Sequence, residues 1–278
     1  MSSCPHCPDF QIKNEFVEEC SRCGLGRSRR SQRPAIAQDY QMKTPETRKS
    51  RSLYFERIYQ RALRKQIPAH GLMLDLGCSD GLMLDLFVRR GWEAEGVEPY
   101  APQDNRNPLI KAVPVESYTP DRAFDLITMI HSFEHMADPA HTLALCWKWL
   151  KPNGKLMIAV PNYGGIWSST TGSDWDWLNP SDHTFHYSAR SLKVMLEDGV
   201  FRVVRSMTND SEAPSMVNVW LDRKKAFERG LMSMQPLRSL LFRLASLLGR
   251  ALRPVWDLSG RGAELWVLAE KVQPVVAH

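Results

Sequence analysis

The chain changes repeatedly between two hydrophobic patterns, and each change marks the boundary of an expected element. Short apolar runs bounded by glycine, proline or polar residues are typical of strands buried in a parallel sheet. Longer segments in which apolar residues recur every three or four positions are typical of amphipathic helices. Strands are predicted at residues 72–76, 94–97, 111–114, 124–130, 155–160, 201–205 and 263–270.

Helices are predicted between several of these strands. The helix ahead of the first strand ends near Pro68, and its apolar residues at helical spacing are Tyr54, Phe55, Ile58, Tyr59 and Leu63. Further helices are expected at 82–90 and 139–150, and the second is closed by the Lys-Pro-Asn-Gly step that ends at Gly154. Strands that alternate with helices in this way predict a doubly wound α/β fold with a seven-stranded sheet.

The turn after the first strand carries the strongest chemical signal. Residues 74–81 read Leu-Asp-Leu-Gly-Cys-Ser-Asp-Gly. Gly77 and Gly81 allow the backbone to turn tightly against a ligand before a helix that begins at Leu82. Glu98 stands at the tip of the next strand, where an acidic side chain can accept both hydroxyls of a ribose. These features predict a cofactor that contains a nucleoside.

The spacing and charge of this turn distinguish between nucleoside cofactors. A dinucleotide site has the pattern Gly-x-Gly-x-x-Gly, because a pyrophosphate approaches the backbone at the helix N-terminus. In this chain the two glycines are four residues apart, and Asp75 and Asp80 add negative charge. Carboxylates repel a pyrophosphate but suit a cofactor that carries an ammonium and a sulfonium. The alternative, an ordinary tight turn without a ligand, leaves the position of Glu98 unexplained.

Residues 74–81 resemble motif I of the class I S-adenosylmethionine-dependent methyltransferases, written Asp-x-Gly-Cys-Gly-x-Gly, with Ser79 in place of the middle glycine. The step at 151–154 resembles the Leu-Lys-Pro-Gly-Gly step of the same family, and the resemblance covers residues 50–271. It implies a Rossmann-like doubly wound seven-stranded sheet with S-adenosyl-L-methionine as cofactor. Glu98 would then hold the ribose, the glycine turn would frame the methionine part, and Val115 and Glu116 would lie near the adenine. The implied cofactor-binding residues are Asp75, Gly77, Cys78, Gly81, Glu98, Val115 and Glu116.

The resemblance also implies that the residues after the fourth strand, His131 to His135, face the methyl group, which makes His131 a catalytic candidate. A hydroxyl acceptor must lose a proton, and histidine is the most common base for this task. In one interpretation His183 or His186 is the general base, because their segment resembles the His-x-x-x-Phe loop of small-molecule methyltransferases. In another interpretation these histidines are purely structural.

A third interpretation is a catalytic divalent metal. His131, Glu134, His135 and a later histidine resemble the Glu-x-x-Glu-His pattern of magnesium-dependent O-methyltransferases, including RNA 3′-terminal 2′-O-methyltransferases. His131 stands where that pattern has its first glutamate, and this substitution disfavours a site for a hard cation.

Four cysteines precede residue 24 in two Cys-x-x-Cys knuckles, Cys4 with Cys7 and Cys20 with Cys23. This is the ligand spacing of a structural zinc ribbon. A segment this short buries little apolar surface, so that zinc would supply its folding energy. Residues 1–26 are therefore predicted to be a zinc ribbon, residues 27–45 a basic linker, and residues 46–278 a methyltransferase domain with a helical insertion at 222–256.

Composition agrees with a soluble protein and excludes few functions. The apolar fraction is 43%, the charged fraction is 24%, and the net charge is a modest +5. The polar N-terminus is unlike a signal peptide, and no run of eighteen apolar residues occurs. We therefore expect a cytoplasmic protein. Leucines on one face and arginines on the other predict a basic amphipathic helix at 237–253, which would pack on the domain, form a homodimer or contact the inner face of a membrane.

The acceptor is indicated by fewer residues than the donor. Trp167, Trp175 and Trp177 lie where the family has its substrate lid, and indole rings stack well on sugars or planar aromatics. A zinc ribbon before such a domain resembles bacterial methyltransferases of the methyltransferase-23 type that modify glycans, sugars or metabolites. The leading hypothesis is O-methylation of a sugar or glycan precursor. RNA methylation, with the ribbon binding RNA, is the alternative. A non-enzymatic docking protein is a third hypothesis, which the intact Gly77, Gly81 and Glu98 disfavour.

Overall fold

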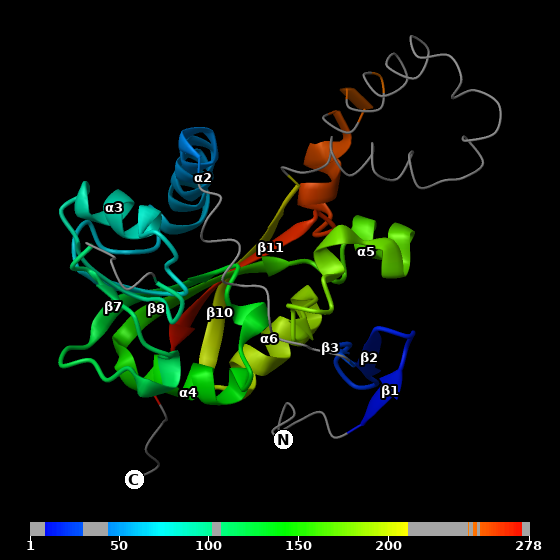
Figure 1. Ribbon diagram of the computed structural model, residues 1–278, viewed down its shortest axis with the longest axis horizontal. Coiled ribbons are helices and arrows are strands. Elements are labelled where there is room, and N and C mark those ends of the chain that lie inside the picture. The colour runs from blue at the N-terminus through cyan, green and yellow to red at the C-terminus, as the bar shows by residue number, and fades with distance from the viewer. Residues whose placement is uncertain are drawn as a thin grey trace.

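The computed structural model describes residues 9–29, 44–101, 107–210, 244, 247–248 and 251–273. Its central feature is a seven-stranded sheet with the order β10-β11-β8-β7-β4-β5-β6 (Figure 1). The strands are β4 (Leu72–Leu76), β5 (Glu93–Val97), β6 (Ile110–Lys111), β7 (Phe124–Ile130), β8 (Leu150–Pro161), β10 (Phe201–Asn209) and β11 (Glu264–Lys271). The predicted doubly wound sheet is confirmed.

Strand direction determines where a ligand can bind. Strands β4 to β8 are parallel, whereas β11 is antiparallel to both β8 and β10. The carboxyl ends of the parallel strands therefore lie at one edge of the sheet. In open α/β sheets this edge is where ligands bind.

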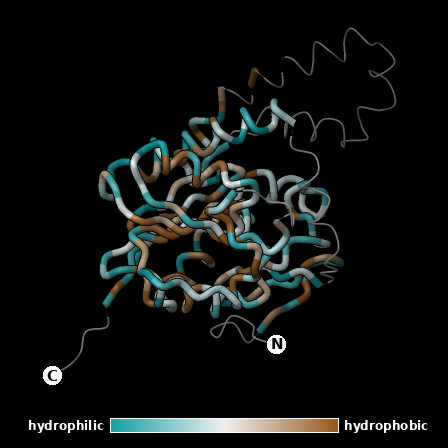
Figure 2. The backbone as a smooth tube through the Cα atoms, turned by 60° about the vertical axis from the view of Figure 1, so that its left-hand side comes forward, coloured by the Kyte–Doolittle hydropathy of each residue, from teal (hydrophilic) through white to brown (hydrophobic). Residues whose placement is uncertain are grey.

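Helices cover both faces of the sheet. Helices α2 (Pro45–Ile58) and α3 (Leu82–Val88) lie on one face, and α4 (Pro139–Trp149) and α6 (Ala189–Asp198) lie on the other (Figure 1). Successive residues of a strand point to opposite faces. Met73 accordingly packs in the core under α2 and α3, while Leu74 packs in the core under α4 and α6. Figure 2 shows the hydrophobic sheet strands at the centre of the molecule, between more hydrophilic outer segments.

The end of α4 differs from the prediction. The helix ends at Trp149, and β8 begins at once with Leu150 and includes the Lys-Pro-Asn-Gly step. Asn153, and not the glycine after it, adopts a left-handed conformation, with φ of 62°. Gly154 is needed for space instead, because a Cβ there would lie 2.9 Å from the carbonyl oxygen of Lys151.

A second, smaller sheet joins the N-terminal segment to the main domain. It contains β1 (Phe10–Ile12), β2 (Val17–Cys20), β3 (Gly26–Ser28) and β9 (Phe185–His186) in that order. Strand β3 pairs antiparallel with β9, so that Gly26 lies opposite His186. The assignment of Arg27 and Ser28 to a linker was wrong, because both residues belong to this strand. Helix α5 (Ile166–Thr171) lies on the same side of the molecule as this sheet (Figure 1).

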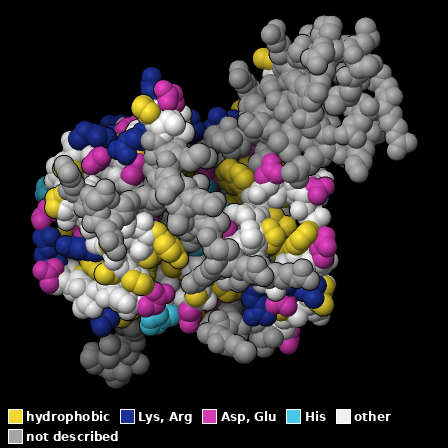
Figure 3. Space-filling model, viewed as in Figure 1, with side chains coloured by type: hydrophobic (Ala, Val, Ile, Leu, Met, Phe, Trp, Pro, Cys, Tyr) yellow, Lys and Arg dark blue, Asp and Glu magenta, His cyan; other side chains and the backbone are white. Residues whose placement is uncertain are grey.

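Several predicted features lie wholly or partly outside the described residues. Cys4, Cys7, residues 30–43 and most of the predicted helix at 237–253 belong to this group. Cys20 and Cys23 are described and are buried beside β2, while zinc itself stays a prediction. Within the part of the chain that the structure describes, no helix has the length and apolar character needed to cross a membrane. Among the described side chains in Figure 3, Lys and Arg are interspersed with Asp and Glu on that face.

Candidate active site

The turn between β4 and α3 has the backbone geometry of a tight ligand-binding loop. Gly77 and Gly81 both adopt left-handed conformations, with φ of 79° and 78°. A Cβ at Gly77 would lie 2.5 Å from the Cβ of Ser132, and one at Gly81 would lie 2.8 Å from Nδ2 of Asn107. Conformation therefore favours glycine at both positions, and the approach of Ser132 also leaves no space for a Cβ at Gly77.

Ser79 keeps the loop conformation although it replaces the glycine of the family motif. Its φ of 53° is left-handed, which is unfavourable for a residue with a Cβ. Its backbone N–H donates to Oε2 of Glu98 at 2.9 Å. The departure at Ser79 thus leaves the turn joined to the acidic residue of the next strand.

Glu98 is held in one orientation at the end of β5. Its side chain is buried, and its Oε1 accepts a hydrogen bond from the Tyr100 N–H at 3.2 Å, while Oε2 binds the Ser79 N–H. A carboxylate oriented by two backbone donors at this strand end suits the predicted contact with a ribose. That role stays a prediction.

Asp75 lies in β4 below the turn and is buried. Its Oδ1 accepts a hydrogen bond from Oγ1 of Thr128 at 2.6 Å. Burial raises the pKa of Asp75 to about 7, and the charge of Glu98 adds to this, although the bond from Thr128 and the charge of Arg51 act in the opposite direction. Asp75 therefore changes its protonation state near neutral pH.

The other candidate residues of the cofactor site lie around the turn or after β6. Asp80 pairs with Arg48 and with Arg51 of α2, the latter at 2.8 Å, so its charge holds the helix over the turn. The Cys78 side chain is buried, and burial raises the pKa of its thiol. Val115 and Glu116 follow β6 in a short 3₁₀ turn, where the valine is buried and the glutamate is exposed.

His131 follows β7 and forms ion pairs with two carboxylates. Its Nε2 lies 2.9 Å from Oε1 of Glu264, and its Nδ1 lies 3.5 Å from Oε1 of Glu134. The Tyr54 hydroxyl lies 3.2 Å from the same Nε2. Burial alone would lower the pKa of His131, but its interactions with the carboxylates of Glu134 and Glu264 outweigh burial and raise the pKa well above its ordinary value. A charged imidazolium cannot accept a proton, so this position suits binding and not general-base catalysis.

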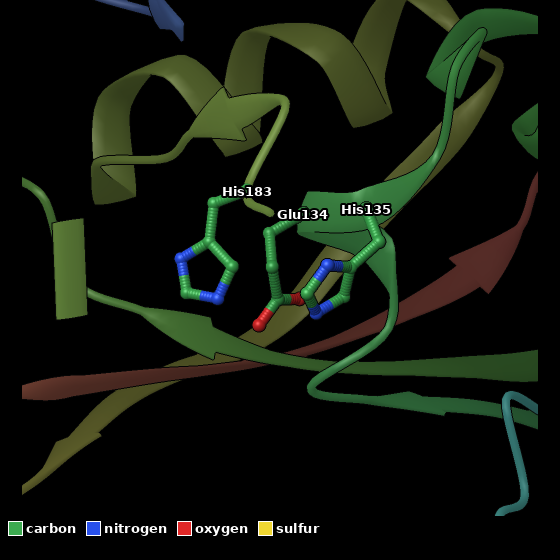
Figure 4. Close-up of side chains that lie close together, drawn as sticks. All are labelled: Glu134, His135 and His183. Atoms are coloured by element: carbon green, nitrogen blue, oxygen red, sulfur yellow. The ribbon is translucent and has the colours of Figure 1, made fainter. Parts of the chain in front are cut away.

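Close to His131, three side chains form a cluster, which consists of Glu134, His135 and His183 (Figure 4). The first two belong to a 3₁₀ turn after β7, and His183 belongs to the segment before β9. The Thr184 N–H donates to the Glu134 carbonyl oxygen at 2.8 Å, which joins the two segments. One potential ligand atom from each of the three side chains lies within 4.8 Å of the others.

The two histidines of the predicted loop have different surroundings. Nδ1 of His183 lies 2.9 Å from the Trp177 carbonyl oxygen, and its ring packs edge-on against His135. His186 is buried, and its Nε2 lies 2.9 Å from Oγ of Ser28 in β3. Burial lowers the pKa of His186 to about 3. Of the pair, His183 lies in the cluster with Glu134, whereas the His186 ring bonds to the N-terminal sheet.

The three tryptophans also differ in their surroundings. Trp167 and Trp175 are buried in a small apolar core that includes Val17 of β2. Trp177 is partly buried and packs edge-on against His131, with ring centroids 5.7 Å apart. Of the three tryptophans, Trp177 is the one whose ring contacts a candidate site histidine.

Sequence reasoning did not identify Glu264 and assigned Tyr54 to helix packing. Both belong to the site, because the Tyr54 hydroxyl donates to the carboxylate that binds His131. A signal was present at Glu264, since a charged residue at the start of an apolar strand is unusual unless it has a partner. Which partner it has depends on the antiparallel register of β11 beside β8.

The fold and the turn after β4 together define a class I S-adenosylmethionine-dependent methyltransferase. The buried Glu98 and the left-handed Gly77 and Gly81 fit that cofactor. The chain belongs to the family described as "Methyltransferase domain", whose model matches residues 47–206.

Similar proteins agree with this class. The "Ubiquinone biosynthesis O-methyltransferase" of Rhodopseudomonas palustris (strain BisB18) is 27% identical over 153 residues, which are 46% of this chain and 60% of that protein. The protein of the same name from Acinetobacter baumannii (strain AYE) is 28% identical over 103 residues, which are 32% of this chain and 44% of that protein. The chain thus spans less than two thirds of the length of these curated relatives.

Solved structures share the fold at low sequence identity. A chain of the complex between the Haloferax volcanii Trm112 methyltransferase activator and a methyltransferase superposes with a TM-score of 0.57 and 17% identity, covering 87% of this chain and 99% of its own. A SAM-dependent methyltransferase from Archaeoglobus fulgidus gives a TM-score of 0.51 and 19% identity, covering 80% and 94% respectively.

Proposed function

We propose that this protein transfers the methyl group of S-adenosylmethionine to a hydroxyl group of a small ring-shaped acceptor. The observation that carries the proposal is the cluster of Glu134, His135 and His183 after β7. In this fold the carboxyl end of a central strand faces the bound ligand. Methyl transfer from a sulfonium needs little from the protein beyond positioning, but a hydroxyl acceptor must also lose its proton.

The histidine cluster has the groups that such a proton transfer requires. The Nδ1 of His183 faces a carbonyl oxygen, which can only accept, so this nitrogen carries the proton and Nε2 keeps its lone pair. Glu134 is buried beside it, so the cluster can stabilise the positive charge that accompanies loss of the hydroxyl proton. An amine acceptor would have less need of this arrangement, since an uncharged amine attacks directly.

The ring shape of the acceptor is supported by Trp177. Its indole, partly buried beside His131, offers an aromatic surface close to the cluster. Sugar rings and planar aromatic rings both stack on indole. A sugar or glycan precursor is the first candidate, and an aromatic hydroxyl compound is the second, because the similar proteins are named for O-methylation in ubiquinone biosynthesis.

Labelled methyl transfer from S-adenosylmethionine into fractionated cell extract tests the proposal. We expect label in the sugar or aromatic small-molecule fraction, and we expect Glu134→Gln to reduce it by about 100-fold or more. Label recovered only in RNA would contradict the proposed acceptor. Label on nitrogen would contradict O-methylation.

A further inference from the structure

We infer that Glu134, His135 and His183 form a site for one divalent transition-metal ion that binds the acceptor hydroxyl. The role of the ion rests on the proposed O-methylation, whereas the site itself rests on side-chain geometry. The three ligand atoms lie within 4.8 Å of one another. Atoms bound to one ion at about 2.0–2.2 Å are at most about 4.4 Å apart, so small side-chain rotations are sufficient to close the site.

Glu134 is the first reason to expect an ion. Only 2% of its side chain is exposed, and neither carboxylate oxygen has a hydrogen-bond donor among the described residues. The closest charged nitrogen is Nδ1 of His131, at 3.5 Å from Oε1, which is too long for a well-formed hydrogen bond. A buried carboxylate without donors is strongly unfavourable unless a cation compensates its charge.

The described groups around Glu134 also carry less positive than negative charge. His131 lies between Glu134 and Glu264, so one imidazolium faces two buried carboxylates. Tyr54 donates to Glu264 as a neutral hydroxyl, and His135 faces a third carboxylate, that of Asp182, at 3.4 Å. A divalent cation beside Glu134 supplies the positive charge that these described groups lack.

The imidazoles are oriented as metal ligands usually are. Nδ1 of His183 bonds to the Trp177 carbonyl oxygen, and Nδ1 of His135 lies 3.2 Å from the Asp182 carbonyl oxygen. Because a carbonyl oxygen only accepts, both Nδ1 atoms carry a proton, and in the neutral rings both Nε2 atoms keep a lone pair for an ion. A ligating histidine typically donates its other N–H to a carbonyl or carboxylate in this way.

The donor set indicates which ions fit. Two imidazole nitrogens and one carboxylate suit Zn²⁺, Mn²⁺, Fe²⁺ or Co²⁺, whereas Mg²⁺ and Ca²⁺ prefer oxygen ligands. Three protein ligands leave positions open for water or for an acceptor, as catalytic sites require. His131 is outside this ligand set, because its Nε2 pairs with Glu264 and its Nδ1 faces Glu134.

The proposed step balances without an oxidant or reductant. The acceptor hydroxyl binds the ion, which lowers its pKa, and its proton leaves to solvent. The resulting oxygen forms a bond to the methyl carbon while the carbon–sulfur bond breaks. The electron pair of that bond stays on sulfur, and the sulfonium becomes a neutral thioether.

Titration with Mn²⁺ alone, followed by electron paramagnetic resonance, tests the site in protein that a mild chelator has freed of weakly bound metal while the predicted cysteine-bound zinc stays in place. Thiolates prefer softer ions, so Mn²⁺ reports on this cluster and not on the cysteines. We expect one Mn²⁺ per wild-type chain, and at least about 10-fold weaker binding in Glu134→Gln and in His183→Ala, since each removes one of three ligands. His141→Gln, on the exposed surface of α4, is the control and should bind as wild type does.

Melting temperatures separate loss of a ligand from loss of folding. Mn²⁺ should raise the melting temperature of the wild type and of His141→Gln but not that of a folded Glu134→Gln. Equal Mn²⁺ affinity in Glu134→Gln and wild type would overturn the site, as would no binding of Mn²⁺ or Co²⁺ by the wild type. Metal-independent methylation would overturn the role of the ion and leave the methyltransferase assignment intact. Metal binding without hydroxyl methylation would refute the proposed hydroxyl acceptor and leave the metal site intact.

Discussion

At the scale of single residues, the cofactor turn depends on a few positions that each have a physical reason. Gly77 and Gly81 have left-handed backbones, and Gly77 also has no room for a Cβ. Ser79 takes the same conformation with a side chain, and its amide binds Glu98. The motif therefore tolerates loss of its middle glycine, because the hydrogen bond to Glu98 comes from the backbone.

Glu98→Gln should weaken the binding of S-adenosylmethionine by about 10- to 100-fold, since hydrogen bonds to a charged group contribute about 1.5–3 kcal/mol. The amide keeps the size of the side chain but cannot accept from two ribose hydroxyls through two equivalent oxygens. Isothermal titration calorimetry measures the change, with Asp121→Asn on the exposed surface as the control. Unchanged affinity in Glu98→Gln would refute the ribose contact.

Asp75 should make stability depend on pH in the opposite direction from an ion-paired carboxylate. Its pKa of about 7 in the folded state lies above the unfolded value of about 3.9, so the folded state binds the proton more tightly. The free energy of unfolding therefore falls as pH rises towards 7. Relative to wild type, Asp75→Asn should gain about 2–3 kcal/mol between pH 5 and pH 8, measured by urea denaturation. Parallel pH profiles for the two proteins would contradict this cause.

At the scale of elements, the contact between β3 and β9 positions the histidine segment. The Ser28 hydroxyl donates to the His183 carbonyl oxygen at 2.6 Å and lies 2.9 Å from Nε2 of His186. The Ser28 N–H also donates to the Thr184 carbonyl oxygen at 3.0 Å. An N-terminal strand therefore forms the support behind the candidate acceptor site.

Ser28→Ala should reduce the free energy of unfolding by about 1–3 kcal/mol, because it leaves buried polar groups of His183 and His186 unpaired. Turnover should fall while the dissociation constant for S-adenosylmethionine stays unchanged, since the turn after β4 is not touched. Chemical denaturation and steady-state kinetics measure the two effects. Ser21→Ala, in the exposed turn after β2, is the matched control. Equal loss in both variants would argue against a positioning role for Ser28.

At the scale of the whole molecule, residues far apart in the chain meet at one edge of the sheet. Glu264 of the last strand binds Tyr54 of α2, His131 after β7 and Asn209 of β10. The N-terminal sheet closes the same region through β9 and through the Arg190 guanidinium, which donates to the Arg22 carbonyl oxygen at 2.8 Å. Folding of the N-terminal segment and completion of the site are thus linked.

Loss of the predicted ribbon zinc should therefore impair catalysis from a distance. Cys20→Ser should reduce the zinc content by one ion per chain and lower turnover several-fold, since β2 and β3 would lose their support. Binding of S-adenosylmethionine should persist. Elemental analysis and calorimetry measure these quantities, and Cys146→Ser, in the core under α4, controls for loss of a buried thiol. Full activity in zinc-depleted Cys20→Ser would show that the ribbon is dispensable.

Local patterns in the sequence determined the strands of the main sheet, the fold class and the cofactor turn, but not the small N-terminal sheet. Periodicity, the two glycines and Glu98 act over a few residues, so they are readable without contacts; β7 has the predicted bounds, Phe124–Ile130. Only the tertiary structure decided which histidine lies beside Glu134, that Glu264 pairs with His131, and that Ser28 supports the histidine segment. Those pairings depend on strand register and on the docking of β3 against β9, which join residues up to 158 positions apart. Periodicity says which face of an element is buried, but the register of distant strands selects the partner.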